Sequence, residues 1–214
     1  MSCEAKILVC FALKEEAGAF QKIAAERSGT TILITGIGRK NAERSVRGAL
    51  ADGLPTLVLT CGFAGGLSPA LEIGDVIFST AGRKLGETLS GLGAARAKLA
   101  CVSHIATTAA EKLELRRTTG ADAVEMESEA IQAVCRERGI PCATVRVISD
   151  TAREDLPLDF NRLSNRDASL NYGKLALAVA RAPGKIPALL RLQKQSRFAA
   201  QRLAEVLAKV IWPA

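Results

Sequence analysis

Aromatic residues are few in this chain of 214 residues, since six Phe, one Tyr and one Trp make up only 4% of it. Base stacking needs more aromatic side chains, and no nucleic-acid motif is present, so nucleic-acid binding is not expected. Charged residues interrupt every apolar run before the roughly 18 residues of a membrane span. The first residues show no basic leader or cleavage site, which predicts a cytoplasmic protein.

Metal-binding patterns are also missing. His104 is the single histidine, and none of the six cysteines forms a C-x-x-C pair. Most of these cysteines lie in apolar stretches, so we expect reduced core residues and no metal. They are Cys3, Cys10, Cys61, Cys101, Cys135 and Cys142.

The net charge of +7 resides in the C-terminal part of the chain. Residues 174–214 hold eight basic residues and one acidic residue, and 187–211 place their apolar side chains on one helical face. This pattern fits a terminal helix that covers the sheet with a solvated basic face. The alternative is a helix that docks on an anionic membrane surface.

Short apolar runs alternate with amphipathic stretches, which predicts a single α/β domain over 1–214 with a largely parallel sheet and a basic helical tail from about residue 174. The expected strands are 6–12, 30–35, 55–60, 75–79, 99–105 and 142–148. The expected helices are 15–27, 41–50, 124–138, 174–182 and 187–211. Residues 61–67, 80–98 and 151–173 are expected to be irregular.

Four motifs, in order, resemble the nucleoside phosphorylase and nucleosidase superfamily, in particular the methylthioadenosine/adenosylhomocysteine nucleosidases. They are FALKEE at 11–16, the turn at 36–38, GFAGGLSPALEIGDV at 62–76, and VEMES at 124–128 followed by VRVISD at 145–150. The resemblance implies a three-layer α/β/α fold with a mixed sheet, cleavage of a purine nucleoside, and a homo-oligomer. It implies that the reaction needs no cofactor and that either water or phosphate is the co-substrate.

A narrower resemblance, to the hopanoid-associated phosphorylases, lies in TTAAEKLELRRTTGADAVEMES at 107–128 and ARAPGKIPALLRLQKQSRFAAQRL at 180–203. Those enzymes act on an adenosylated hopane, which is a lipid. This resemblance implies a lipid-linked nucleoside as substrate and peripheral contact with the inner face of the membrane.

Cleavage of a nucleoside requires an acid near the departing purine. Asp150 ends an apolar strand, and burial there favours the protonated carboxyl near neutral pH. The resemblance gives Asp150 this role and puts Ser149 at the substrate. Taken alone, this segment would be a helix or turn cap.

Glu127 is the candidate for holding the ribose, since a carboxylate accepts hydrogen bonds from two hydroxyls and favours positive charge on the sugar. The resemblance assigns it this role, and Met126 would pack on the sugar unless it is a core residue. Glu125 is expected to be a solvated or capping acid.

Glu16 matches the family base that orients or activates the attacking water, although an exposed acid in a first helical turn is the alternative. Arg146 would hold a water or phosphate oxygen, or else form a salt bridge on its strand. The backbone N–H groups at Gly62, Ala64, Gly65 and Gly66 would approach the sugar or its attacking oxygen.

Two departures from the family pattern bear on the nucleophile. Phe63 replaces a common serine in the substrate-binding loop, and Thr60 replaces the phosphate-binding arginine of hexameric phosphorylases. Lys14, Arg39, Lys40 and Arg146 are the other candidates for binding phosphate. These departures leave open an alternative, a catalytically silent protein that binds a nucleoside or lipid.

Overall fold

The computed structural model describes residues 6–51, 53–163 and 172–213. The strands are β1 (Ile7–Phe11), β2 (Thr30–Ile34), β3 (Leu57–Gly66), β4 (Val76–Thr80), β5 (Ala95–Arg96), β6 (Leu99–Cys101), β7 (Ala123–Glu125) and β8 (Cys142–Asp150). The helices are α1 (Lys14–Ala24), α2 (Arg39–Ala49), α3 (Arg83–Gly91), α4 (Ala109–Thr119), α5 (Ser128–Glu137), α6 (Phe160–Leu163), α7 (Tyr172–Arg181), the 3-10 turn η1 (Pro183–Lys185) and α8 (Ile186–Ile211).

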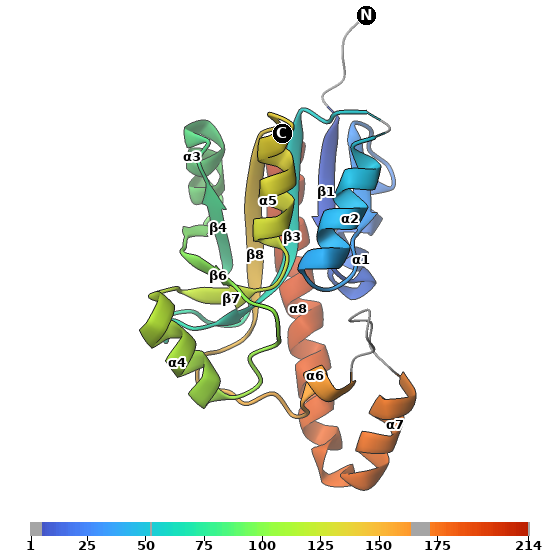
Figure 1. Cartoon of the computed structure of the whole chain (residues 1–214), viewed down its shortest axis with the longest axis vertical. Helices are drawn as coiled ribbons and strands as arrows, with labels where there is room; N and C mark the ends of the chain where they lie inside the picture. Colours follow the sequence, from blue (N-terminus) through green and yellow to red (C-terminus); the bar gives the residue numbers. More distant parts are fainter. Residues whose placement is uncertain (1–5, 52, 164–171, 214) are drawn as a thin grey trace, which may run out of the picture.

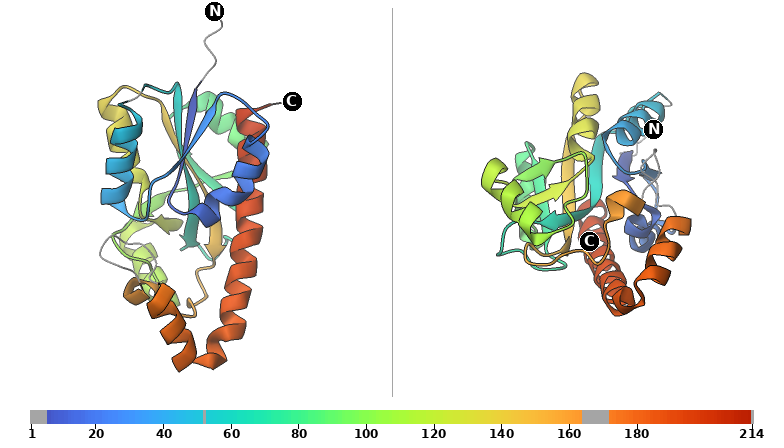
Figure 2. Two further views of the ribbon diagram at one scale, coloured as in Figure 1. Left: turned by 90° about the vertical axis from the view of Figure 1, so that its right-hand side faces the viewer. Right: turned by 60° about the horizontal axis from the view of Figure 1, so that its bottom comes forward.

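Within the described residues, eight strands form one mixed and mostly parallel sheet, whose main path is β2-β1-β3-β8-β4-β5. Strand β4 runs antiparallel to β8, and β7 runs antiparallel to the end of β3. Helices α1 and α8 pack together over one face of the sheet, and α2 and α5 over the other (Figures 1 and 2). This arrangement confirms the predicted three-layer α/β/α fold.

The central strands are buried on both faces, which explains their nearly continuous apolar sequences. Phe11, Phe20 and Leu203 belong to the core under α1 and α8, whereas Val46 and Ile131 belong to the core under α2 and α5. Cysteine thiols also fill these cores, as predicted for Cys10, Cys61 and Cys135, which are free and buried. Cys101 and Cys142 are free and partly buried, and Cys3 lies outside the described residues.

The predicted loop at 61–67 is wrong, because β3 continues through Gly66. Its glycines still form ladder pairs, with β8 on one side and with Val124 of β7 on the other. The predicted helix at 124–138 accordingly divides into β7 and α5, and the predicted strand at 99–105 ends at Cys101.

The stretch 80–98 was expected to be irregular but contains α3 and β5. Its glycines conceal the helical spacing of Leu85 and Leu89, and Leu89 is fully buried. Within 151–173, the structure describes the short helix α6, and residues 164–171 lie outside the described part.

Helix α7, the turn η1 and the first half of α8 form a helical hairpin, residues 172–198, that projects beyond the sheet (Figures 1 and 2). The second half of α8 covers the sheet as predicted and buries Ala199, Leu203 and Leu207. Pro187 does not break α8, because it lies in the first helical turn, where its missing N–H is not needed. None of the described helices combines the length and apolar character required to cross a membrane.

Candidate active site

A cavity of about 170 Å³ lies at the carboxyl ends of the parallel strands β1, β3 and β8. Ligand sites of open α/β sheets usually lie at this edge. Most of the predicted site residues line this cavity: Glu16, Phe63, Ala64, Met126, Glu127, Ser149 and Asp150. Gly62 and Arg146 lie behind its wall.

Glu16 enters the cavity from the first turn of α1 and is buried. Its Oε2 accepts the backbone N–H groups of Ala12 and Leu13, both at 2.9 Å, and its Oε1 accepts that of Phe63 at 2.8 Å. Burial raises the pKa of Glu16 to about 7, and the opposing effects of Arg146 and these N–H groups only partly offset it. A carboxyl group with this pKa is poised to accept a proton near neutral pH.

Gly62 makes the close approach behind Glu16 sterically feasible. Its φ is +144°, and a Cβ there would lie 2.7 Å from both Arg146 Nη1 and Glu16 Oε1. A side chain would therefore occupy the space between the guanidinium group and the carboxyl group.

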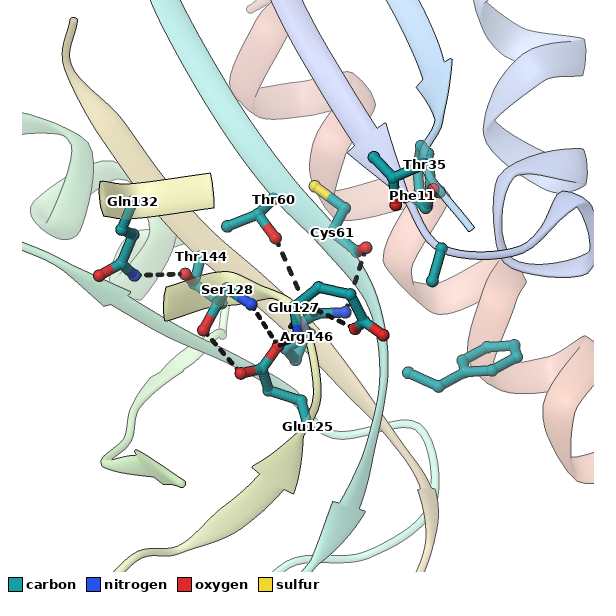
Figure 3. Close-up of polar contacts among 12 residues, drawn as sticks. Phe11, Thr35, Thr60, Cys61, Glu125, Glu127, Ser128, Gln132, Thr144 and Arg146 are labelled. Carbon is teal, nitrogen blue, oxygen red and sulfur yellow. Dashed lines mark hydrogen bonds and ion pairs between the residues drawn. The ribbon is translucent and has the colours of Figure 1, made fainter. Parts of the chain in front are cut away.

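Arg146 is fully buried beneath the cavity and links three parts of the site (Figure 3). Its Nη2 lies 2.5 Å from Glu125 Oε2 and 3.5 Å from Glu127 Oε2. The guanidinium also donates to the Cys61 carbonyl and the Thr60 hydroxyl, both at 3.3 Å. The structure thus gives Arg146 the salt bridge that the sequence left as one alternative.

Glu127 stands at the start of α5, where its Oε1 accepts the backbone N–H of Gly38 at 2.8 Å. Gly38 follows β2 with a φ of +86°, so the glycine turn at 36–38 directs an N–H toward this carboxylate. Burial raises the pKa of Glu127, Arg146 opposes this change, and the neighbouring Glu125 adds to it.

Glu125 is not solvated, because only 5% of the residue is exposed. It is the predicted capping acid, since its carboxylate accepts the backbone N–H groups of Glu127 at 3.0 Å and Ser128 at 2.8 Å. Burial acts to raise its pKa, but Arg146 and the Ser128 hydrogen bonds outweigh burial and lower it. Both effects favour the charged form of Glu125, which is the carboxylate nearest to Arg146.

Ser149 and Asp150 are consecutive in β8, yet both line the cavity. The register with β3 shifts here, because Ala64 pairs with Ile148 and Gly65 pairs with Asp150. A bulge of this kind redirects side chains. As a result, the Ser149 hydroxyl donates to Asp150 Oδ1 at 2.7 Å.

Sequence reasoning missed Lys112, which lies on α4 and is fully buried. Its Nζ is 2.5 Å from Asp150 Oδ2. An ion pair favours the charged carboxylate, so burial alone does not describe the environment of Asp150. The sequence offered no local signal, because α4 has little amphipathic pattern and buries Lys112 while its apolar neighbour Leu113 is 68% exposed.

The four basic residues considered for phosphate binding do not line the cavity. Lys14, Arg39 and Lys40 are exposed, and Arg39 forms a salt bridge with Glu129. Arg146 lies behind the cavity wall, where it forms a salt bridge with Glu125. Ile105 and Ala106 also line the cavity, and Phe63 supplies an aromatic ring to its wall.

Comparison with known proteins matches residues 90–181 to the family described as the Phosphorylase superfamily. The 5′-methylthioadenosine/S-adenosylhomocysteine nucleosidase of Anoxybacillus flavithermus is 26% identical over 215 residues, which cover 76% of this chain and 92% of the relative. The aminodeoxyfutalosine nucleosidase of Campylobacter jejuni is 27% identical over 168 residues, which cover 63% of this chain and 73% of the relative.

Solved structures share the fold at low sequence identity. The futalosine hydrolase of Helicobacter pylori has a TM-score of 0.71 and 16% identity, and the match covers 98% of this chain and 100% of that one. The 5′-methylthioadenosine/S-adenosylhomocysteine nucleosidase of the same organism, solved with butyl-thio-DADMe-Immucillin-A, has a TM-score of 0.71 and 17% identity. That match covers 97% of this chain and 100% of the other.

Proposed function

We propose that this chain is a member of the nucleoside phosphorylase and nucleosidase superfamily that hydrolyses the N-glycosidic bond of an adenine nucleoside. The observation that carries the proposal is the convergence of Glu16, Glu127 and Asp150 on one cavity at the carboxyl edge of the sheet. These three carboxyl groups come from separate elements, and each suits a different part of the reaction. The nucleosidase names of the relatives support the same chemistry.

Asp150 delivers a proton to the departing purine, and Ser149 orients it through the 2.7 Å hydrogen bond to Oδ1. Glu127 accepts hydrogen bonds from the ribose hydroxyls, while Met126 packs on the sugar beside it. The negative charge of Glu127 favours the positive charge that develops on the sugar as the bond breaks.

Glu16 holds the attacking water and accepts its proton, with a pKa raised by burial to about 7. Water is favoured over phosphate because the cavity wall contains no lysine or arginine among the described residues. A phosphate ion bound without such a group would meet several carboxylates and little compensating charge.

We also propose that the substrate carries an apolar group at the ribose 5′ position, as in an adenosine linked to a hopane lipid, and that the hairpin at 172–198 docks on an anionic membrane. The hairpin contains six basic residues and no acidic one. Four of the six large apolar side chains that are exposed among the described residues lie on it: Leu177, Ile186, Leu190 and Phe198. Basic and apolar side chains together are what an anionic lipid surface attracts.

The test is release of free adenine from 5′-methylthioadenosine and from an adenosine with a long 5′-alkyl chain, with and without phosphate. Wild type should release adenine without phosphate, prefer the long-chain compound, and lose activity on Asp150→Asn. Dependence on phosphate would instead make the protein a phosphorylase. Binding of both compounds without release of adenine would favour the catalytically silent binding protein.

A further inference from the structure

Lys112 is completely buried on a helix whose other charged side chains face outward or lie near the surface. Its Nζ lies 2.5 Å from Asp150 Oδ2, and it donates to the carbonyl oxygens of Thr151 at 2.7 Å and Glu154 at 2.9 Å. We propose that Lys112 and Asp150 form one proton-donating pair, in which Lys112 positions Asp150 and supplies the proton that Asp150 delivers to the departing purine. The inference rests on the proposed hydrolysis of a nucleoside.

The contacts of Lys112 define its charge in the resting site. An ammonium group has three N–H donors, whereas a neutral amine has two. Three acceptors surround Nζ, so the charged form satisfies each of them and the neutral form would leave one without a donor. A buried charge also requires a counter-charge, which the Asp150 carboxylate provides.

A carboxylate has no proton to give, so a proton must reach Asp150 before the purine can take it. As the N-glycosidic bond breaks, its electron pair moves to the purine, and a ring nitrogen takes a proton from Asp150. Asp150 in turn takes a proton from Lys112 Nζ, across the 2.5 Å contact. The attacking water forms the new bond to the sugar and gives its proton to Glu16.

Charge is conserved in these transfers. The site begins with a Lys112 ammonium and two carboxylates, and it ends with a neutral Lys112 amine, the Asp150 carboxylate and a protonated Glu16. After the free purine and the sugar leave, solvent removes the proton from Glu16 and returns one to Lys112. The pair thus protonates the departing base although Asp150 is a carboxylate in the resting site.

Other titratable and charged groups surround Asp150. His104, Glu16, Glu125 and Glu127 line the same cavity, Glu154 and Asp155 lie in the loop after β8, and Arg191 of α8 borders an adjoining cavity. Glu154 accepts hydrogen bonds from the Thr151 backbone N–H and hydroxyl, both at 3.2 Å. His104 also lines the cavity, and histidine is the most frequent general acid in enzymes, so it needs its own control.

The experiment is the pH profile of kcat/KM for adenine release by wild type, Lys112→Met, Lys98→Met and His104→Gln. Lys98 is the matched control, because its Nζ donates to the Thr119 carbonyl at the other end of α4 and it is exposed. A lysine ordinarily holds its proton to about six pH units above an aspartic acid. Wild type should therefore stay active well into the alkaline range.

In Lys112→Met the proton must reside on Asp150 itself, so the alkaline limit of kcat/KM should move down by at least about one pH unit. Above the displaced limit the rate of Lys112→Met should fall about tenfold for each pH unit while wild type stays active, up to the roughly 100-fold that general acid catalysis usually contributes. Lys98→Met and His104→Gln should leave the alkaline limit in place.

Three results would overturn the inference. The first is an equal loss at every pH with an unmoved limit, which would make Lys112 a structural residue only. The second is higher alkaline activity in Lys112→Met, which would mean that Lys112 keeps the proton away from Asp150. The third is a wild-type alkaline limit in the acid range of carboxyl groups, a readout that does not require the variant to fold. Failure of wild type to release adenine at any pH would instead refute the proposed function, and the inference with it.

Discussion

Gly62→Ala tests whether the site depends on the close approach of Glu16 and Arg146. The added Cβ would lie 2.7 Å from Glu16 Oε1 and from Arg146 Nη1, closer than real Cβ contacts come. Both side chains are buried, so neither can retreat into solvent. Glu16 is further fixed by its three backbone N–H donors, and Arg146 by Glu125. The methyl group must therefore displace one of them or bend β3.

The magnitude follows from two effects. A residue with a Cβ at a φ of +144° is strained by about 1–3 kcal/mol, and overpacking a buried site adds about 1–3 kcal/mol. We expect the free energy of unfolding to fall by about 2–6 kcal/mol. A catalytic group misplaced by about 1 Å lowers the rate about 100-fold, and we expect kcat/KM to fall by that order.

Thermal unfolding and adenine release measure the two effects separately, and Gly18→Ala is the control. Gly18 lies in α1, the helix that carries Glu16, and a Cβ there meets nothing within 4 Å. Alanine at that position should stabilise the protein by about 0.5–1 kcal/mol and leave activity unchanged. If Gly62→Ala matched wild type in melting temperature and kcat/KM, the close approach would not matter and the reasoning would fail.

Three further predictions follow from the charges and the hairpin. Glu16 accepts a proton only as a carboxylate, and its pKa is raised to about 7. We therefore expect kcat/KM to drop about tenfold for each pH unit below pH 7. A kcat/KM that stays constant from pH 5 to pH 7 would contradict this expectation. Arg146→Met should lower the free energy of unfolding by about 3–5 kcal/mol in denaturant titrations, because it leaves Glu125 buried without its cation. An unchanged free energy of unfolding would show that the ion pair does not stabilise the fold. Leu190→Asp should weaken cosedimentation with anionic vesicles but leave turnover of 5′-methylthioadenosine unchanged. The control is Leu54→Asp, which changes an equally exposed leucine before β3 and should affect neither measurement. Equal vesicle binding by the two variants would refute docking of the hairpin.

The sequence predicts the layers and the edge of the sheet that carries the site, because both depend on local patterns. Buried parallel strands appear as apolar runs, and Asp150 comes at the end of such a run. The motif containing Glu16 likewise follows the first strand directly. Parallel strands bring their carboxyl ends together at one edge of the sheet. The sequence spacing and the family resemblance were therefore enough to predict that these residues share one site.

The partners of those carboxyl groups could not be predicted in the same way. Lys112 is 38 residues from Asp150 along the chain and lies on a helix with little amphipathic pattern, so nothing local marks it as buried. Gly62 was expected to bring its backbone toward the sugar, whereas its missing side chain makes room behind the wall. Both contacts depend on tertiary packing, which local sequence patterns do not predict.

The three glutamates of the site also show why a motif alone does not assign chemistry. One guanidinium serves all three, and Glu125 lies nearest, at 2.5 Å, with Glu127 at 3.5 Å and Glu16 beyond salt-bridge distance across Gly62. The pKa of Glu125 is lowered, because Arg146 and the Ser128 donors outweigh burial there, whereas burial prevails and raises the pKa at Glu127 and Glu16. The charged form of the carboxylate closest to the cation is thereby favoured, and the two carboxyl groups with raised pKa values are the better suited to exchange protons and hydrogen bonds with a substrate. Exchanging the roles of these glutamates would require moving Arg146, so the position of this one buried cation, more than the carboxylates themselves, determines which of them can act.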